Sequence, residues 1–291
     1  MADDVVNNFL TIFDTLVKHE GGVKTPKLIL HARQRRGNGK TFTFNRMGHM
    51  VAGIAPADGS DIPLQNVEQD NVTVSVQDLY AVALSKERDL NKISYDERRE
   101  LAMAAAAASA NEQDQRFINA LVAGKSATIS AGATNRNWTL ADFVDLVQEV
   151  KSKNISGNLY YAVHPKSLAA ALRTTEVASA DYNVTRALAM GDLPAYMGVT
   201  FIQIGDLVTA DNPDGGLPQG GTGNNDRSNF LFSDEAMGWA MSQEVKTVVD
   251  WLPGKQGWMV GQHYSAAAVA IGSFTAGREG IYEHIVDEAV V

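Results

Sequence analysis

The longest helical pattern of the chain covers residues 94–124, where strong helix formers continue without proline or internal glycine. The Ser94 hydroxyl and the Glu97 carboxylate have the spacing of a capping box, and Gly124 is a typical helix stop. At 1.5 Å per residue this helix would be about 45 Å long. Its alanine-rich middle would let a sheet lie close, while larger apolar side chains would anchor its far end, namely Phe117, Ile118, Leu121 and Val122. A long helix in an unrelated α+β enzyme would give the same pattern.

The region before this helix alternates between extended and turn-rich stretches. Residues 5–20 have apolar positions spaced for one side of a short amphipathic helix. Residues 28–30 and 41–45 have the pattern of two extended arms joined by a basic, glycine-rich tip, which predicts a hairpin. Residues 48–69 are polar and turn-rich, so the hairpin is expected to be long and poor in core residues. Alternation over residues 72–84 predicts a further strand.

The chain after the long helix changes to short alternating elements. The pattern predicts an α/β unit in the order helix, strand, helix, helix and strand, over residues 140–153, 159–163, 165–173, 184–190 and 199–204. Thr139 is the expected cap of the first of these helices. Residues 211–228 are rich in Gly, Asn, Asp and Pro and have little to hold them in a core, so they predict a surface loop.

Two long extended runs complete the pattern. Residues 236–251 and 257–272 are joined through a Pro-Gly pair and predict a long hairpin. The tryptophans of these runs need a wide apolar surface, which a sheet beside the long helix would provide. The chain is therefore expected to leave a first domain near residue 138 and to return to it near residue 236.

Length, charge and cysteine content narrow the classes of function. The 291 residues suffice for one large or two ordinary domains with a buried core. The absence of cysteine excludes disulfides, thiolate catalysis and cysteine-ligated zinc. The sequence has no apolar run of about 18 residues and starts with acidic residues, so we expect neither a membrane span nor a signal peptide. The net charge of −9 argues against a general nucleic-acid binder, because phosphate neutralisation needs a surplus of Lys and Arg.

The sequence contains no complete motif of a catalytic or ligand-binding site. The stretch GNGKT at residues 37–41 ends like a phosphate-binding loop, but Gln34 stands where the signature needs glycine, and a strand pattern follows instead of a helix. The six histidines lack metal-binding spacing, the acidic pairs mark no acid/base dyad, and no serine lies in a Gly-x-Ser-x-Gly context. We therefore predict no catalytic, cofactor or metal site.

A cluster of positive charges lies in the predicted hairpin tip and consists of Arg33, Arg35, Arg36 and Lys40. Crowded like charges repel one another unless acidic groups approach, and the chain has a surplus of carboxylates. We predict that this cluster contacts an acidic surface on a neighbouring subunit; the alternative is a solvated loop. The apolar side of the predicted N-terminal helix, with Phe9 and Phe13, is expected to dock on a neighbour as well.

The order of these features resembles the major capsid protein of tailed bacteriophages, with its Hong Kong 97-type fold. In that α+β fold an N-terminal arm precedes a long extended hairpin, the E-loop. A peripheral domain built on a long spine helix against a sheet follows, and an α/β axial domain is inserted into it. Two short segments are also similar to sequences of that family. Residues 191–199 (GDLPAYMGV) resemble a turn of the axial domain, and residues 249–258 (VDWLPGKQGW) resemble the hairpin with which the chain returns to the peripheral domain.

The resemblance covers nearly the whole chain and implies a division into four parts. These are an N-terminal arm at residues 1–27, an E-loop hairpin at 28–71, a peripheral domain at 72–137 and 236–291 with the spine helix at 94–124, and an axial domain at 138–235.

The resemblance implies a structural major capsid protein that self-assembles, as pentamers and hexamers, into an icosahedral head around double-stranded DNA. The DNA would not be bound sequence-specifically, and no cofactor, membrane or enzymatic role is implied. Only about 90 residues precede the spine helix, and the arm and hairpin use them. No trimming is therefore expected, and a separate scaffolding protein and a portal protein are implied partners.

The implied location is the virion, after assembly in the host bacterial cytoplasm. Two alternatives stay open at this point. An encapsulin-like nanocompartment shell shares the fold and would be recognised by bound cargo protein. An α/β enzyme would require a pocket with convergent polar groups.

Overall fold

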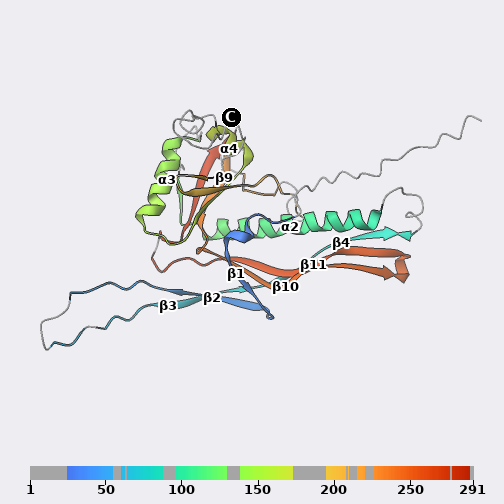
Figure 1. The fold of residues 1–291 in the computed structure, drawn as a ribbon, viewed down its shortest axis with the longest axis horizontal. Helices are drawn as coiled ribbons and strands as arrows, with labels where there is room; N and C mark the ends of the chain where they lie inside the picture. The colour runs from blue at the N-terminus through green and yellow to red at the C-terminus, as the bar shows by residue number, and fades with distance from the viewer. Residues whose placement is uncertain are drawn as a thin grey trace, which may run out of the picture.

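The computed structural model describes residues 25–54, 60–62, 64–87, 96–129, 138–172, 195–207, 209, 215–219, 226–275 and 277–288. These residues form an elongated molecule in which a long helix lies lengthwise on a narrow sheet, with a second sheet and two shorter helices at one end (Figure 1). A two-stranded hairpin projects away from the same end. The predicted arm at residues 5–20, with Phe9 and Phe13, and the predicted helix at residues 184–190 lie outside the described residues.

The long helix α2 spans Glu97–Gly124 and confirms the predicted spine, but its cap differs from the predicted capping box. Asp96 is the N-cap, and its side chain accepts a hydrogen bond from the Arg99 backbone N–H. Glu97 does not return to a cap residue, because its carboxylate accepts a hydrogen bond from the hydroxyl of Ser85 on a neighbouring strand. Aspartate caps a helix about as well as serine does, so the start lies two residues later than a Ser94 cap would give.

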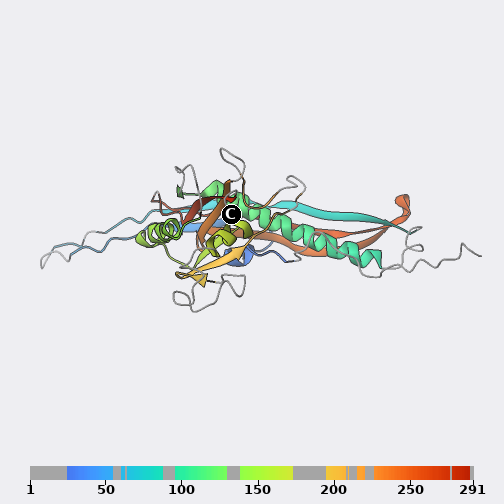
Figure 2. The same ribbon diagram turned by 90° about the horizontal axis from the view of Figure 1, so that it is seen from above.

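The sheet beneath α2 has four strands in the order β1-β10-β11-β4. Their bounds are β1 Arg33–Arg36, β4 Gln77–Lys86, β10 Met237–Leu252 and β11 Gly257–Ala270. The short 3-10 helix η2, Pro253–Lys255, joins β10 to β11 and confirms the predicted long hairpin. Small buried alanines of α2 permit its close approach to the sheet, which Figure 1 shows from the side; Figure 2 shows the helix following the length of the strands. A Cβ atom at Gly124 would lie 2.1 Å from the Ala270 Cβ, so this glycine also serves the packing.

The predicted pairing of residues 28–30 with 41–45 is wrong. Ile29–His31 forms a 3-10 turn, η1, and β1 pairs in parallel with β10, more than 200 residues away. The hairpin consists instead of β2, Thr41–Met47, and β3, Gln69–Ser75, which run antiparallel. The alternating Phe residues do mark a strand, but its partner follows residues 48–68 instead of preceding the basic stretch.

Phe44 holds the hairpin against the four-stranded sheet. Its ring is buried with Ala240 and Ile271 in a small core of its own, and it lies over Gly238 of β10. A Cβ atom at Gly238 would lie 2.8 Å from the nearest ring carbon of Phe44, so any larger residue must displace the ring. Gly238 therefore provides the space in which the Phe44 ring packs the hairpin against the sheet.

We expect Gly238→Ala to destabilise the subunit by about 1–3 kcal/mol, the usual cost of overpacking a core. The measurement is the free energy of unfolding from urea titration. Gly254→Ala is the matched control, since an added Cβ there meets no described atom within 4 Å. Equal stability of the two variants would mean that the packing of Phe44 over Gly238 does not hold the hairpin against the sheet.

The second sheet has six strands in the order β5-β12-β9-β6-β8-β7. Their bounds are β5 Ala127–Ile129, β6 Leu159–Val163, β7 Ala195–Tyr196, β8 Val199–Gln203, β9 Asp226–Ser233 and β12 Ile281–Asp287. Two helices pack against it, α3 Leu140–Ser152 and α4 Pro165–Leu172, and Thr139 caps α3 as predicted. The last strand, β12, pairs with β9 and not with the long hairpin. Sheet membership thus crosses the predicted division at residue 236, which stays a prediction.

The predicted surface loop at residues 211–228 carries core contacts. Leu217 is 1% exposed and packs in the same cluster as Phe117 and Leu121 of α2. The backbone N–H of Gly216 donates to the Gln115 side chain, and Arg227 donates to the Leu217 carbonyl. The expectation that nothing holds this stretch in a core was wrong, because one leucine among many glycines suffices to anchor it.

Leu217→Ala is expected to cost about 2–5 kcal/mol of stability, the range for removing a buried leucine side chain. Thermal or urea unfolding measures this loss. Leu30→Ala, at a leucine that is largely exposed, should change stability by less than about 0.5 kcal/mol. A Leu217→Ala variant as stable as this control would show that residues 211–228 do behave as a solvated loop.

Candidate intersubunit surface

The predicted basic cluster lies on β1 and in the turn after it. Arg33, Arg35 and Arg36 are exposed strand residues, and Lys40 is exposed in the turn before β2. The structure therefore brings the four residues into one short region, although not to the free tip of a hairpin. The region is fixed to its own subunit by the pairing of β1 with β10.

Two of these cations have partners within the same subunit. The Arg36 guanidinium forms an ion pair with Glu244 of β10 at 3.0 Å, with both side chains well exposed. The Arg35 guanidinium carbon lies 6.0 Å from the centroid of the Phe44 ring. Exposed ion pairs contribute only about 0.2–1 kcal/mol, so Arg36 stays available for exchange with another carboxylate. The side chains of Arg33 and Lys40 make no ion pair with any other described residue.

Sequence reasoning missed a set of exposed apolar side chains beyond β2 and β3. We call residues 48–54, 60–62 and 64–68 the hairpin end. Its exposed apolar residues are Met50, Val51, Ile54, Ile62 and Leu64, of which Ile54 is 98% and Leu64 is 96% exposed. Two hydrogen bonds between Val51 and Gln65 tie its two sides together. Apolar side chains held this far from any core are typical of an interaction site.

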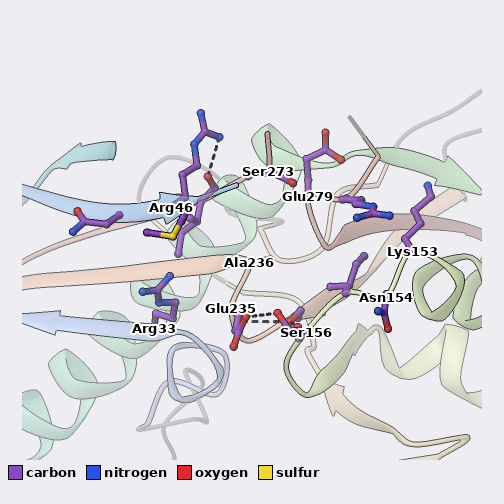
Figure 3. A pocket seen from close by; sticks show the side chains of 16 residues that line it. Arg33, Arg46, Lys153, Asn154, Ser156, Glu235, Ala236, Ser273 and Glu279 are labelled. Atoms are coloured by element: carbon purple, nitrogen blue, oxygen red, sulfur yellow. Dashed lines mark hydrogen bonds between the residues drawn. The ribbon is translucent and has the colours of Figure 1, made fainter. Parts of the chain in front are cut away.

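The base of the hairpin borders a polar hollow of about 320 Å³. It lies between β1, β2, the turn after α3, the turn between β9 and β10, and the segment between β11 and β12. Figure 3 shows Arg33 on one side, Lys153 on the other, and Glu235 hydrogen-bonded to Ser156. Arg46 enters from β2, where it donates to Asp70 at 2.7 Å and lies over the Phe274 ring at 4.8 Å.

A buried carboxylate on α2 anchors the chain at Lys27 and Leu28. Asp114 of α2 accepts hydrogen bonds from the backbone N–H groups of Lys27 and Leu28, at 3.0 Å, and Leu28 is fully buried. Burial raises the pKa of Asp114, although these hydrogen bonds act in the opposite direction. The backbone at Lys27 and Leu28 is thereby tied to α2.

The six-stranded sheet holds a buried histidine under α3. His284 Nδ1 lies 2.8 Å from the Tyr161 hydroxyl, and Nε2 has no hydrogen-bond partner. Burial lowers the pKa of His284 to about 4, so the ring is neutral at physiological pH. Burial also lowers the pKa of the nearby His164, which contacts Glu288. Both are structural groups of the subunit interior.

Within the described part of the chain, no group of three His, Asp or Glu side chains could hold a metal ion. None of its helices is long and apolar enough to cross a membrane. The described residues form a body with a projecting apolar hairpin end and exposed charges near the hairpin base, which suits association between subunits.

Comparison with solved structures identifies the fold of the chain. The chain is similar to the capsid of cyanophage P-SCSP1u, with a TM-score of 0.72, 13% identity, and coverage of 98% of this chain and 95% of that chain. It is also similar to the head structure of Helicobacter pylori bacteriophage KHP40, with a TM-score of 0.71, 11% identity, and 99% of each chain covered. The mature capsid of bacteriophage PhiM1 gives a TM-score of 0.67 at 12% identity, covering 96% of this chain and 92% of that chain. These matches establish the Hong Kong 97-type fold.

The family model described as phage capsid protein matches residues 5–274, and the chain belongs to this family. It is a structural major capsid protein. The encapsulin-like alternative is not favoured over this assignment, and family membership indicates a structural role. A search of curated proteins finds no match.

Proposed function

We propose that this major capsid protein assembles, as pentamers and hexamers, into an icosahedral head that encloses double-stranded DNA. The observation that carries the proposal is the hairpin end, whose apolar side chains contact little within their own subunit. Such side chains are stable in water only at a cost, which a neighbouring subunit would remove by covering them. The match to a phage capsid family supports the same conclusion.

The proposal includes partners that follow from this role. A separate scaffolding protein would guide assembly, and a portal protein would occupy one vertex. Packaged DNA would meet a chain of net charge −9 and would not be gripped sequence-specifically. Assembly would take place in the host bacterial cytoplasm.

We further propose that the basic region and the N-terminal segment contact neighbouring subunits. The residues concerned are Arg33, Arg35, Arg36, Lys40, Phe9 and Phe13. The exposed ion pair of Arg36 with Glu244 supports this proposal, because a weak pair within one subunit can be replaced by a pair between subunits.

Negative-stain microscopy of the purified chain tests the proposed assembly. The expected result is shells, tubes or isolated capsomers at raised protein concentration. A chain that stays monomeric at all concentrations, alone and with cell extract of the phage-infected host, would overturn the proposal.

A further inference from the structure

A charged cluster lies at the edge of the second sheet where β6 and β8 end. These two strands run parallel, so their carboxyl ends meet at the same edge. His164 follows β6 directly, and Asp206 lies shortly after β8. Arg227 and Glu288 reach this edge from the start of β9 and from the end of β12. The side chains of His164, Arg227 and Glu288 are each only 4% exposed, whereas that of Asp206 is 61% exposed.

The Glu288 carboxylate lies among polar groups from three other segments. Its Oε1 atom lies 2.5 Å from His164 Nδ1 and accepts a hydrogen bond from the Ser167 hydroxyl at 3.2 Å. Its Oε2 atom lies 3.5 Å from Arg227 Nε. Ser167 belongs to the first turn of α4, and the partial positive charge of a helix N-terminus favours an anion there. The position of this carboxylate is therefore the position of an anion ligand.

The groups around Glu288 are held in place by other contacts. Arg227 Nη1 donates to the Leu217 carbonyl at 2.8 Å, and the His164 backbone N–H donates to the Asn229 side chain at 3.0 Å. Arg227 Nε is buried without a hydrogen-bond partner and faces the carboxylate. Burial and the adjacent Arg227 lower the pKa of His164, so Arg227 is the cation that balances Glu288 at neutral pH. The binding groups thus do not depend on Glu288 for their positions.

We propose that this edge of the second sheet is a carboxylate-binding site whose resident ligand is Glu288 of the same chain. The side chain acts as a latch that holds the end of β12 against α4 and β9, and a free small carboxylate can replace it. A dianion such as phosphate suits the site less, because Asp206 lies 3.4 Å from Arg227 Nη2 and would repel the additional charge. The inference does not depend on how subunits assemble, so its failure would leave the proposed function intact.

Removing the ligand and supplying a carboxylate in solution tests the site in the full chain. Glu288→Ala is expected to lower the midpoint of thermal unfolding by about 6 °C or more, because it leaves Arg227 buried without its counter-charge. Sodium formate at about 0.1 M is expected to restore about half of that loss, because it binds the folded chain. Sodium chloride at the same ionic strength should not restore it. Glu288→Gln keeps the shape of the side chain without its charge, so it should lose stability and gain nothing from formate.

Matched variants separate this site from a general effect of carboxylates. Glu244→Ala is the control, since Glu244 is an exposed carboxylate that also pairs with an arginine, and formate should leave its midpoint unchanged. Glu288→Ala combined with Arg227→Gln should not respond to formate. A Glu288→Gln variant as stable as the unmodified chain, or equal stabilisation of Glu288→Ala and Glu244→Ala by formate, would overturn the inference. If Glu288→Ala does not fold in chloride, its refolding yield is expected to be higher in formate, and equal yields would overturn the inference as well.

Discussion

Replacing Ile54 and Leu64 with serine is expected to stop particle assembly while the subunit stays folded. The two side chains are 98% and 96% exposed, so the isolated subunit loses almost no packing. In a shell these two side chains would be buried against a neighbouring subunit. Burying one such side chain stabilises the contact by roughly 1.5–3 kcal/mol. Because each subunit of a closed shell repeats the contact, a loss of this size at every copy prevents growth of the shell.

Two measurements check this prediction. Unfolding by urea should give the wild-type midpoint, and negative-stain microscopy should show no shells. Leu30→Ser is the matched control, since Leu30 is also an exposed leucine but lies in η1 outside the hairpin end. Shells of normal size from the double serine variant would mean that the apolar hairpin end is dispensable.

The elements that sequence reasoning placed correctly are those with local signals. Thr139 caps α3, strand β6 occupies the predicted residues 159–163, and a Pro-Gly pair joins β10 to β11. Each depends on residues within a few positions of one another. The order of these elements also sufficed to suggest the fold, because few soluble domains combine a long alanine-rich helix with an inserted α/β unit.

Errors arose where a partner is distant in sequence. The pattern of residues 33–36 did not reveal that β1 pairs with β10, because strand pairing over 200 residues leaves no local mark. The basic tip was therefore assigned to a hairpin that it does not form. Leu217 was overlooked for a similar reason, since a single apolar residue in a glycine-rich stretch has no periodicity. The exposed apolar residues of the hairpin end, among them Ile54 and Leu64, were overlooked because they are scattered through a polar, turn-rich stretch without periodicity.

Acid is expected to destabilise the subunit through His284. Its pKa falls from an ordinary value of 6.5 to about 4 because the ring is buried under α3. The unfolded chain therefore binds a proton below about pH 6.5, whereas the folded chain resists it until about pH 4. A histidine with a lowered folded-state pKa contributes stability above the unfolded pKa and loses it as the pH falls. At pH 4 the loss reaches about 3 kcal/mol, at 1.36 kcal/mol per pH unit.

Urea unfolding of His284→Gln at several pH values tests this origin of acid sensitivity. The variant should be less stable at pH 7, because it loses the contact with Tyr161, yet its stability should fall far less between pH 6.5 and pH 4. His164 stays in place and has a pKa shifted in the same direction, so a smaller slope should persist. His49→Gln, at an exposed histidine of the hairpin end, should keep the wild-type slope. An unchanged slope in His284→Gln would assign the acid sensitivity to other groups, with the contact between His164 and Glu288 the next to test.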